Sequence, residues 1–218
     1  MTLDPALIPT DTAVSTYALI RDETAERKAA AFLLGDNLER TTQGGGIYTY
    51  TSQQGAAAFR DTGSFDAAGS LSQENAEAFC RDFCKAFSYD TPIFTLDETG
   101  SGTATAVRLW NGTPVFNAAV TFTIDQGRVL SASGALLPET GAETSSGQKP
   151  LSAFAALTAF QQMRHASSSV VSSITEVSLC YELQSTTAAP MALVPSWRIV
   201  TDTATFYVNC ISGTVRRA

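Results

Sequence analysis

Residues 115–124 read Val-Phe-Asn-Ala-Ala-Val-Thr-Phe-Thr-Ile, and the alternation in this stretch decides the fold. Every second residue from Phe116 to Ile124 is apolar, and most residues between them are polar. A period of two with one apolar side is typical of an antiparallel strand that buries one face. Turn signals flank the stretch, Asn111-Gly112 before it and residues 125–127 (Asp-Gln-Gly) after it. We therefore expect hairpins at both ends of this strand.

Working outward, the spacing of apolar residues predicts three helices. The first runs from Glu23 to Leu34, with acidic residues in its first turn and Gly35 just after its end. The second begins near Ser72, which we expect to be its N-cap, and the third begins at Ser152 in the same way. The apolar stripe of the second helix consists of Ala76, Phe79, Cys80, Phe83, Cys84 and Phe87.

Further strands are predicted on both sides of the third helix. Residues 175–183 alternate cleanly, and strands are also expected at 103–110, 128–132, 193–200 and 205–211. On the strand at 175–183 the polar side consists of Glu176, Ser178, Cys180 and Glu182. The order of a helix followed by three strands therefore occurs twice, once in residues 72–135 and once in residues 151–217.

This order predicts an α+β fold with two tandem units, each of one helix packed on a small antiparallel sheet. Residues 1–70 are expected to precede them as a segment with a helix and a short hairpin. The first unit is expected at residues 71–137 and the second at residues 150–218. Residues 138–149, which are polar and rich in Gly and Ser, are predicted to be the linker between the two units.

Composition and charge exclude several classes of protein. Of the 218 residues 44% are hydrophobic and 16% charged, which is typical of a globular chain. Lys and Arg total 14 and Asp and Glu total 21, so the net charge is −7 and nucleic acid is not an expected partner. The sequence has no apolar run of about 18 residues and does not begin like a signal peptide. Both a cytoplasmic protein and a domain separated from its membrane anchor fit these observations.

The cysteines are the first candidates for chemistry. Cys80 and Cys84, four residues apart on a predicted helix, would form half of a metal site or a redox pair if two further soft ligands lay close by. Cys180 and Cys210 stand alone in predicted strands. We therefore interpret Cys80 and Cys84 as small apolar residues of the helix stripe, and we predict no metal site and no cofactor.

The remaining candidates for catalysis lack the surroundings that catalysis needs. His165 is the sole histidine, no Gly-x-Ser-x-Gly motif accompanies it, and we interpret it as a residue at a helix end. Residues 44–46 (three glycines) are not followed by the Lys of a phosphate-binding loop. The adjacent acids Asp22-Glu23 and Asp97-Glu98 stand in predicted caps or loops. We predict no catalytic residue, although a pair of carboxylates that meet in space would make a hydrolase.

Aromatic residues are spread over the predicted strands. An aromatic sheet face binds a peptide or a sugar in some proteins, but more often it packs under a helix. We interpret these residues as core and predict no particular interaction surface from them. They are Tyr48, Tyr50, Trp110, Tyr181, Trp197 and Tyr207.

Two segments nevertheless resemble a known family. Residues 111–117 (Asn-Gly-Thr-Pro-Val-Phe-Asn) with residues 125–129 (Asp-Gln-Gly-Arg-Val), and residues 193–199 (Leu-Val-Pro-Ser-Trp-Arg-Ile) with residues 206–209 (Phe-Tyr-Val-Asn), resemble the YycI family and its YycH relatives. The resemblance extends over most of residues 7–215. The order of helices and strands is also similar to PepSY-like repeats.

The YycI and YycH resemblance implies a non-catalytic extracytoplasmic domain of a bacterial protein with a single membrane anchor, which this chain would lack. Such a domain modulates the sensor histidine kinase of a two-component system that governs cell-wall homeostasis. Its partners would be that kinase and a YycH-like protein, and a homodimer is also considered. In an extracytoplasmic domain Cys180 and Cys210 could form a disulfide between neighbouring strands. The PepSY-like resemblance implies the alternative, a module that binds a peptide or inhibits a protease.

Overall fold

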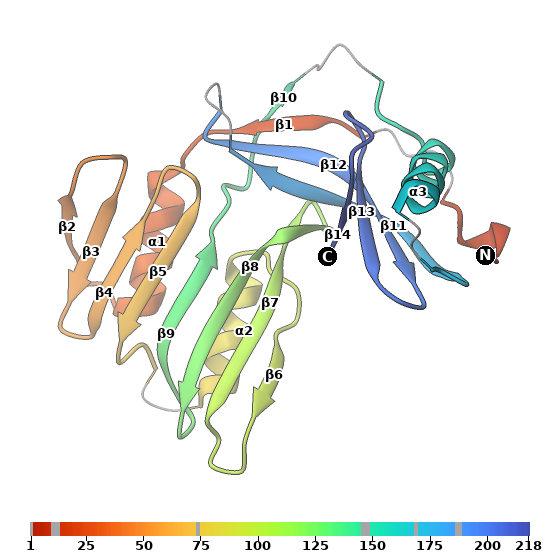
Figure 1. The fold of residues 1–218 in the computed structure, drawn as a ribbon. Coiled ribbons are helices and arrows are strands. Elements are labelled where there is room, and N and C mark those ends of the chain that lie inside the picture. Colours follow the sequence, from red (N-terminus) through yellow and green to blue (C-terminus); the bar gives the residue numbers. More distant parts are fainter. Residues whose placement is uncertain (1, 10–13, 73–74, 145–148, 168–169, 186–188) are drawn as a thin grey trace. The chain divides into compact units, whose positions relative to one another are not determined.

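The computed structural model describes residues 2–9, 14–72, 75–144, 149–167, 170–185 and 189–218, and it has an α+β fold (Figure 1). The chain divides into two compact units, each described here by itself. Unit 1 comprises residues 1–18, 142–184 and 192–218, and unit 2 comprises residues 19–141 and 185–191.

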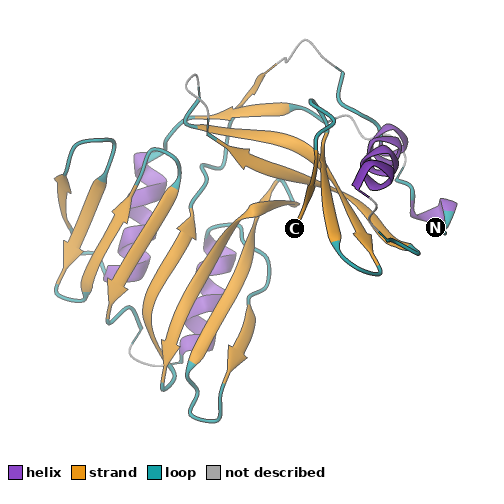
Figure 2. Ribbon diagram, in the orientation of Figure 1, coloured by secondary structure: helices purple, strands orange, loops and turns teal. Residues whose placement is uncertain are grey.

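Unit 2 is an antiparallel sheet with two helices on one face (Figure 2). The strand order is β2-β3-β4-β5-β9-β8-β7-β6, so β2 and β6 are its two edges. The helices are α1 (Glu23–Leu34) and α2 (Ala76–Ala86). The strands are β2 (Glu39–Thr42), β3 (Tyr48–Ser52), β4 (Gly55–Phe59), β5 (Ser64–Gly69), β6 (Ile93–Leu96), β7 (Gly102–Trp110), β8 (Thr113–Asp125) and β9 (Arg128–Ala135).

The core of unit 2 lies between this sheet and its helices. Phe32 of α1 meets Phe79 and Phe83 of α2, with ring centroids 5.2 and 5.5 Å apart, and Phe83 also packs on Phe122 of β8. The helix α1 has the predicted bounds because Asp22 caps it by accepting hydrogen bonds from the Thr24 and Ala25 amides. Aromatic packing therefore fixes both helices on one face of the sheet and leaves the other face without a helix.

Unit 1 contains one helix, α3 (Ala153–Ser167), and the antiparallel meander β11-β12-β13-β14. Phe160 of α3 packs on Phe206, with ring centroids 4.9 Å apart, and the Trp197 indole donates a hydrogen bond to the Leu151 carbonyl. The strands are β11 (Ile174–Gln184), β12 (Met191–Thr201), β13 (Thr205–Asn209) and β14 (Val215–Arg217). A short 3-10 helix, η1 (Pro5–Leu7), and the pair β1 (Thr16–Leu19) and β10 (Ala142–Thr144) complete the described elements.

One pattern occurs three times along the chain: a helix followed by four strands in an antiparallel meander. It begins at α1, at α2 and at α3. The predicted α+β class is confirmed, but the residues between the first and second helices form four strands where a single hairpin was expected. The other two repeats also have four strands each, where three were expected. The predicted boundaries at residues 70 and 137 fall between elements.

Three local predictions need correction. The N-cap of α2 is Asn75, whose side chain accepts a hydrogen bond from the Ala78 amide, and Ser72 is buried before the helix. The segment predicted as a linker contains β10, because Thr144 pairs with Thr16; residues 145–148 of it lie outside the described residues. The register between β7 and β8 shifts at a bulge: Val107 pairs with Ala119, but the next residue, Arg108, pairs with Val115. Residues 116–118 of β8 therefore have no partner residue in the β7 register, and Phe116 does not follow the predicted alternation.

Among the described residues, no helix combines the length and the apolar character that crossing a membrane requires.

Candidate functional site

The four cysteines are buried and free, so the structure contains no Cys180–Cys210 disulfide. Cys80 and Cys84 lie in the core of unit 2, as the sequence indicated, and burial raises the pKa of each thiol to about 12. Cys180 lies on the polar side of β11 but is covered there, and its thiol donates to the Ser196 carbonyl at 3.2 Å. Thiols in such surroundings hold their protons and are poor nucleophiles.

The other predicted candidates occupy structural positions. His165 is exposed in the last turn of α3. The Asp97 carboxylate closes a turn by accepting hydrogen bonds from the Thr99 hydroxyl and from the Ser101 and Thr99 amides, and these bonds lower the pKa of its carboxyl. Within the described ranges, no group of three His, Cys, Asp or Glu side chains is placed to hold a metal ion.

The sheet of unit 2 has one edge that carries no charge. Strand β6 reads Ile-Phe-Thr-Leu and pairs with β7 alone, and Ile93 keeps 75% of its surface exposed. The opposite edge, β2, reads Glu-Arg-Thr-Thr. Charged residues at an edge discourage the addition of another strand, and an uncharged edge with exposed apolar residues favours it.

The backbone of β6 alternates between bonding to β7 and pointing away from it. The Asp97 amide donates to the Ser101 carbonyl at 2.9 Å, and the register continues through Thr95–Thr103 and Ile93–Thr105. In an antiparallel pair, hydrogen-bonded and non-bonded positions alternate. The N–H and C=O groups of Phe94 and Leu96 therefore point outward, away from β7.

Charged residues of α2 lie beside this edge. The Arg81 guanidinium lies 5.3 Å from the centre of the Phe94 ring, and the charged residues that line a hollow next to it are Arg81, Lys85 and Asp90. At the other end of β6, Leu96 and two residues of opposite charge, Glu77 and Arg128, line a second hollow. The hollow at the start of the strand therefore has two basic residues and one acid, and the hollow near its end has one residue of each charge.

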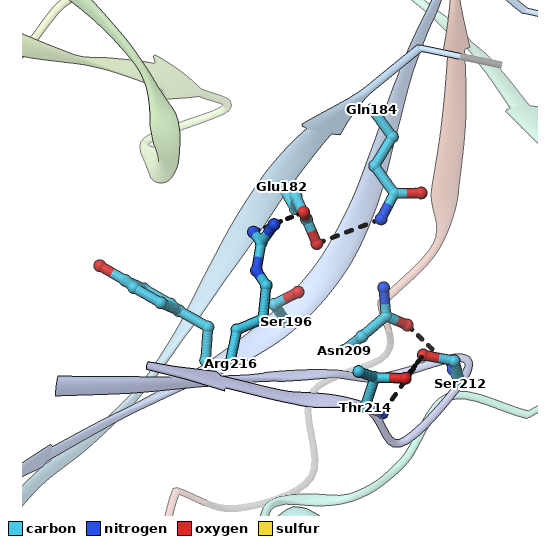
Figure 3. A pocket seen from close by; sticks show the side chains of 8 residues that line it. Glu182, Gln184, Ser196, Asn209, Ser212, Thr214 and Arg216 are labelled. Carbon is cyan, nitrogen blue, oxygen red and sulfur yellow. Dashed lines mark hydrogen bonds and ion pairs between the residues drawn. The ribbon is translucent and has the colours of Figure 1, made fainter. Parts of the chain in front are cut away.

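Unit 1 has a pocket of about 230 Å³ on the sheet face that α3 does not cover (Figure 3). The strand register explains the position of the pocket. Leu179, Trp197 and Val208 are paired across the three strands and face the core. The next paired residues, Cys180, Ser196 and Asn209, therefore face the opposite side of the sheet. The lining residues are Glu182, Gln184, Ser196, Tyr207, Asn209, Ser212, Thr214 and Arg216. The alternation of β11 predicts its polar side, but no pattern in the sequence predicts this pocket.

Glu182 organises one side of the pocket. One of its carboxylate oxygens accepts from the Arg216 guanidinium at 2.6 Å, and the other accepts from the Gln184 amide at 3.1 Å. The Asn209 side chain is fixed on the other side of the pocket, because its Oδ1 accepts hydrogen bonds from the Ile211 and Ser212 backbone amides at 2.9 Å each. Each of these planar side chains is therefore held in one orientation before any ligand arrives.

The Ser196 hydroxyl is the unusual group of the pocket. Ser196 is only 1% exposed, and its oxygen has no hydrogen-bond partner among the described residues. Figure 3 shows its side chain among Arg216, Glu182 and Asn209. A buried hydroxyl without a partner is costly, so such a group calls for an explanation.

These features define an α+β protein of three helix-and-four-strand repeats, with an uncharged edge in unit 2 and a polar pocket in unit 1. No model of a protein family matches the sequence, and no curated protein matches it. The chain is similar in fold to the crystal structure of an uncharacterized protein from Eubacterium rectale, with TM-score 0.51 and 12% identity over 94% of this chain and 81% of the other.

The C-terminal domain of Bacillus megaterium YpeB also matches, with TM-score 0.41 and 13% identity over 91% of this chain and 98% of that domain. Neither structure is described as a YycI or YycH protein. The similarity to the E. rectale protein concerns the fold alone.

Proposed function

We propose that the chain is a non-catalytic, PepSY-like module that binds an extended peptide segment of a partner protein along β6. The observation that carries the proposal is the uncharged edge of unit 2, with Ile93 exposed and no acidic or basic residue in the strand. An extended peptide that joins such an edge gains main-chain hydrogen bonds, and its alternate side chains give specificity.

The backbone limits the strength of this interaction. The outward groups of Phe94 and Leu96 offer two N–H donors and two C=O acceptors. Four main-chain hydrogen bonds at about 0.5–1.5 kcal/mol each give roughly 2–6 kcal/mol before the cost of association. Contact with Ile93 and with α2 adds to this sum, so we expect micromolar or weaker dissociation constants.

The charges beside the strand give the peptide a preferred composition. Arg81 and Lys85 outnumber the single acid, Asp90, in the hollow at the start of β6, so an acidic side chain of the peptide would be attracted there. At the other end of β6 the charges of Glu77 and Arg128 offset each other, so we expect no preference for a charged side chain there. We therefore expect a peptide with β-branched residues at alternate positions and an acidic residue near one end.

The test compares two substitutions at one position. Leu96→Pro removes the outward N–H without removing a bond to β7, and Leu96→Ala removes the side chain but keeps that N–H. Peptides selected from a phage-displayed dodecapeptide library against the whole chain are labelled and titrated by fluorescence polarisation. We expect Leu96→Pro to weaken binding at least about tenfold and Leu96→Ala to weaken it by less than about threefold.

Failure to enrich any peptide would contradict the proposal, and so would equal binding by the wild type and Leu96→Pro. A sensor-kinase ectodomain is tested with the same two variants. If it binds Leu96→Pro and Leu96→Ala equally, the kinase uses a surface other than β6. Loss of a homodimer in Leu96→Pro would identify the segment added to β6 as a second copy of this chain. Protease inhibition would require that a peptidase lose activity on binding and regain it with Leu96→Pro.

A further inference from the structure

The pocket in unit 1 lies outside the proposed peptide site and carries its own chemistry. None of its eight lining residues has an aliphatic side chain: they are two charged residues, two amides, three hydroxyl residues and one tyrosine. Its volume of about 230 Å³ is below the roughly 300–1,000 Å³ of pockets that hold drug-sized ligands. The pocket therefore suits one small polar molecule.

The charges of the lining cancel each other. The Arg216 guanidinium lies 2.6 Å from the Glu182 carboxylate, whose second oxygen is taken by Gln184. Glu182 is 9% exposed, so this pair is held partly out of water. With one positive and one negative group already paired, the lining favours a neutral ligand over a net anion or cation.

The groups that remain available are donors and acceptors together. The Ser196 hydroxyl is buried without a described partner and can do both. The Asn209 amide nitrogen makes no hydrogen bond to a described residue, and the Gln184 carbonyl oxygen makes none either, because only the other ends of these amides are engaged. A ligand that satisfies all three must both donate and accept at several neighbouring atoms, which is what vicinal hydroxyl groups do.

We propose that this pocket binds a single saccharide unit. The hydroxyls of a pyranose ring would hydrogen-bond to Ser196, Asn209 and Gln184, and the Tyr207 ring would offer an apolar surface to its C–H groups. The pre-set orientations of Glu182 and Asn209 reduce the entropy lost on binding. The buried Ser196 hydroxyl is then a binding group whose partner arrives with the ligand.

The proposal is tested by NMR on the full chain labelled with nitrogen-15. D-glucose, D-galactose and N-acetyl-D-glucosamine are titrated separately, and L-alanine serves as a zwitterion of similar polarity. We expect at least one sugar to bind saturably in the millimolar range, as a site of this size and polarity allows. The shifted amides should belong to residues 182–184, 196 and 209–216.

Ser196→Ala separates a binding role from a structural one. It should weaken sugar binding at least about fivefold, because one hydrogen bond is lost. The thermal midpoint without sugar should stay the same or rise, because the substitution removes an unsatisfied buried hydroxyl. Ser133→Ala, which removes an exposed hydroxyl of β9 in unit 2, is the matched control and should change neither quantity.

Three results would overturn the proposal. The first is the absence of saturable binding by all three sugars. The second is equal sugar binding by the wild type and Ser196→Ala, or shifted amides that lie outside the pocket. The third is saturable binding of L-alanine with no binding of any sugar, which would assign the pocket to a zwitterionic ligand.

Discussion

Arg108 is buried in unit 2 to 2% exposure, and replacing it tests how a lone buried cation is stabilised. Its guanidinium donates hydrogen bonds to the carbonyls of Ser88, Leu109 and Leu137 at 2.5, 2.8 and 3.1 Å. The Tyr89 ring lies 5.6 Å away, and no ion pair joins Arg108 to an acid of the described residues. Burial lowers the pKa of this guanidinium from its usual value.

The expected effect of Arg108→Met follows from two opposing contributions. Three hydrogen bonds from a charged donor contribute about 1.5–3 kcal/mol each, or roughly 4.5–9 kcal/mol in total. Removing the charge also removes a desolvation penalty of several kcal/mol, and methionine fills most of the space of the aliphatic stem. We expect a net loss of about 2–4 kcal/mol in the free energy of unfolding, because the buried Leu137 carbonyl and the partly buried Leu109 carbonyl each lose this hydrogen bond, whereas the Ser88 carbonyl keeps its bond from the Leu109 amide.

Urea unfolding, followed by fluorescence and circular dichroism, measures this loss. Arg128→Met, at an exposed position of β9, is the control and should change the free energy of unfolding by less than about 0.5 kcal/mol. Arg108→Lys keeps the charge but lacks the planar fork, so it should lie between the wild type and Arg108→Met. If Arg108→Met is as stable as the wild type or more so, desolvation outweighs the hydrogen bonds and this reasoning is refuted.

Two further predictions concern stability. Burial raises the pKa of four thiols to about 12, namely those of Cys80, Cys84, Cys180 and Cys210. Above about pH 9 the unfolded chain releases these protons and the folded chain keeps them. The free energy of unfolding therefore has its full value below about pH 9 and falls as the pH rises from about 9 towards 12. Urea midpoints at pH 8, 9 and 10 check this, and a midpoint that rises with pH would contradict it. Gly134→Ala should destabilise the chain by roughly 1–3 kcal/mol, because its Cβ would lie 2.1 Å from the Ala119 carbonyl oxygen. An unchanged thermal midpoint would show that β8 and β9 separate easily.

Helix α1 and strand β11 were predictable because their signals are local. The α1 sequence has a cap at Asp22, acids in the first turn and Gly35 after its end, and its observed bounds agree with the prediction. In β11 a strict alternation puts Cys180 and Glu182 on one side and Val177 and Leu179 on the other, as the register shows. Patterns of this kind are set by the residues of one element and its immediate neighbours.

Predictions failed where several local solutions were equally good or where a partner strand decided the outcome. Ser and Asn are both favourable N-caps, but the Ser72 amide bonds to the Val129 carbonyl of β9 and Asn75 caps α2. The passed-over residues 116–118 depend on the pairing of β8 with β7, which no periodicity within β8 shows. The pocket depends on pairing as well, because Glu182 and Arg216 are 34 residues apart in the sequence.

Three of the strands that sequence analysis missed, β2, β6 and β14, share a physical cause. Each of them is an edge strand that pairs with one neighbouring strand. Backbone hydrogen bonds to that neighbour are enough to form the strand, so its side chains need not alternate between apolar and polar. Freedom from the core also leaves these strands able to vary in charge, from Glu39-Arg40 in β2 to none in β6. The helix-and-four-strand repeat thus has a constrained interior, which the sequence reveals, and unconstrained edges and open faces. Both proposed binding sites depend on such strands, the peptide site on β6 and the sugar site on Arg216 of β14.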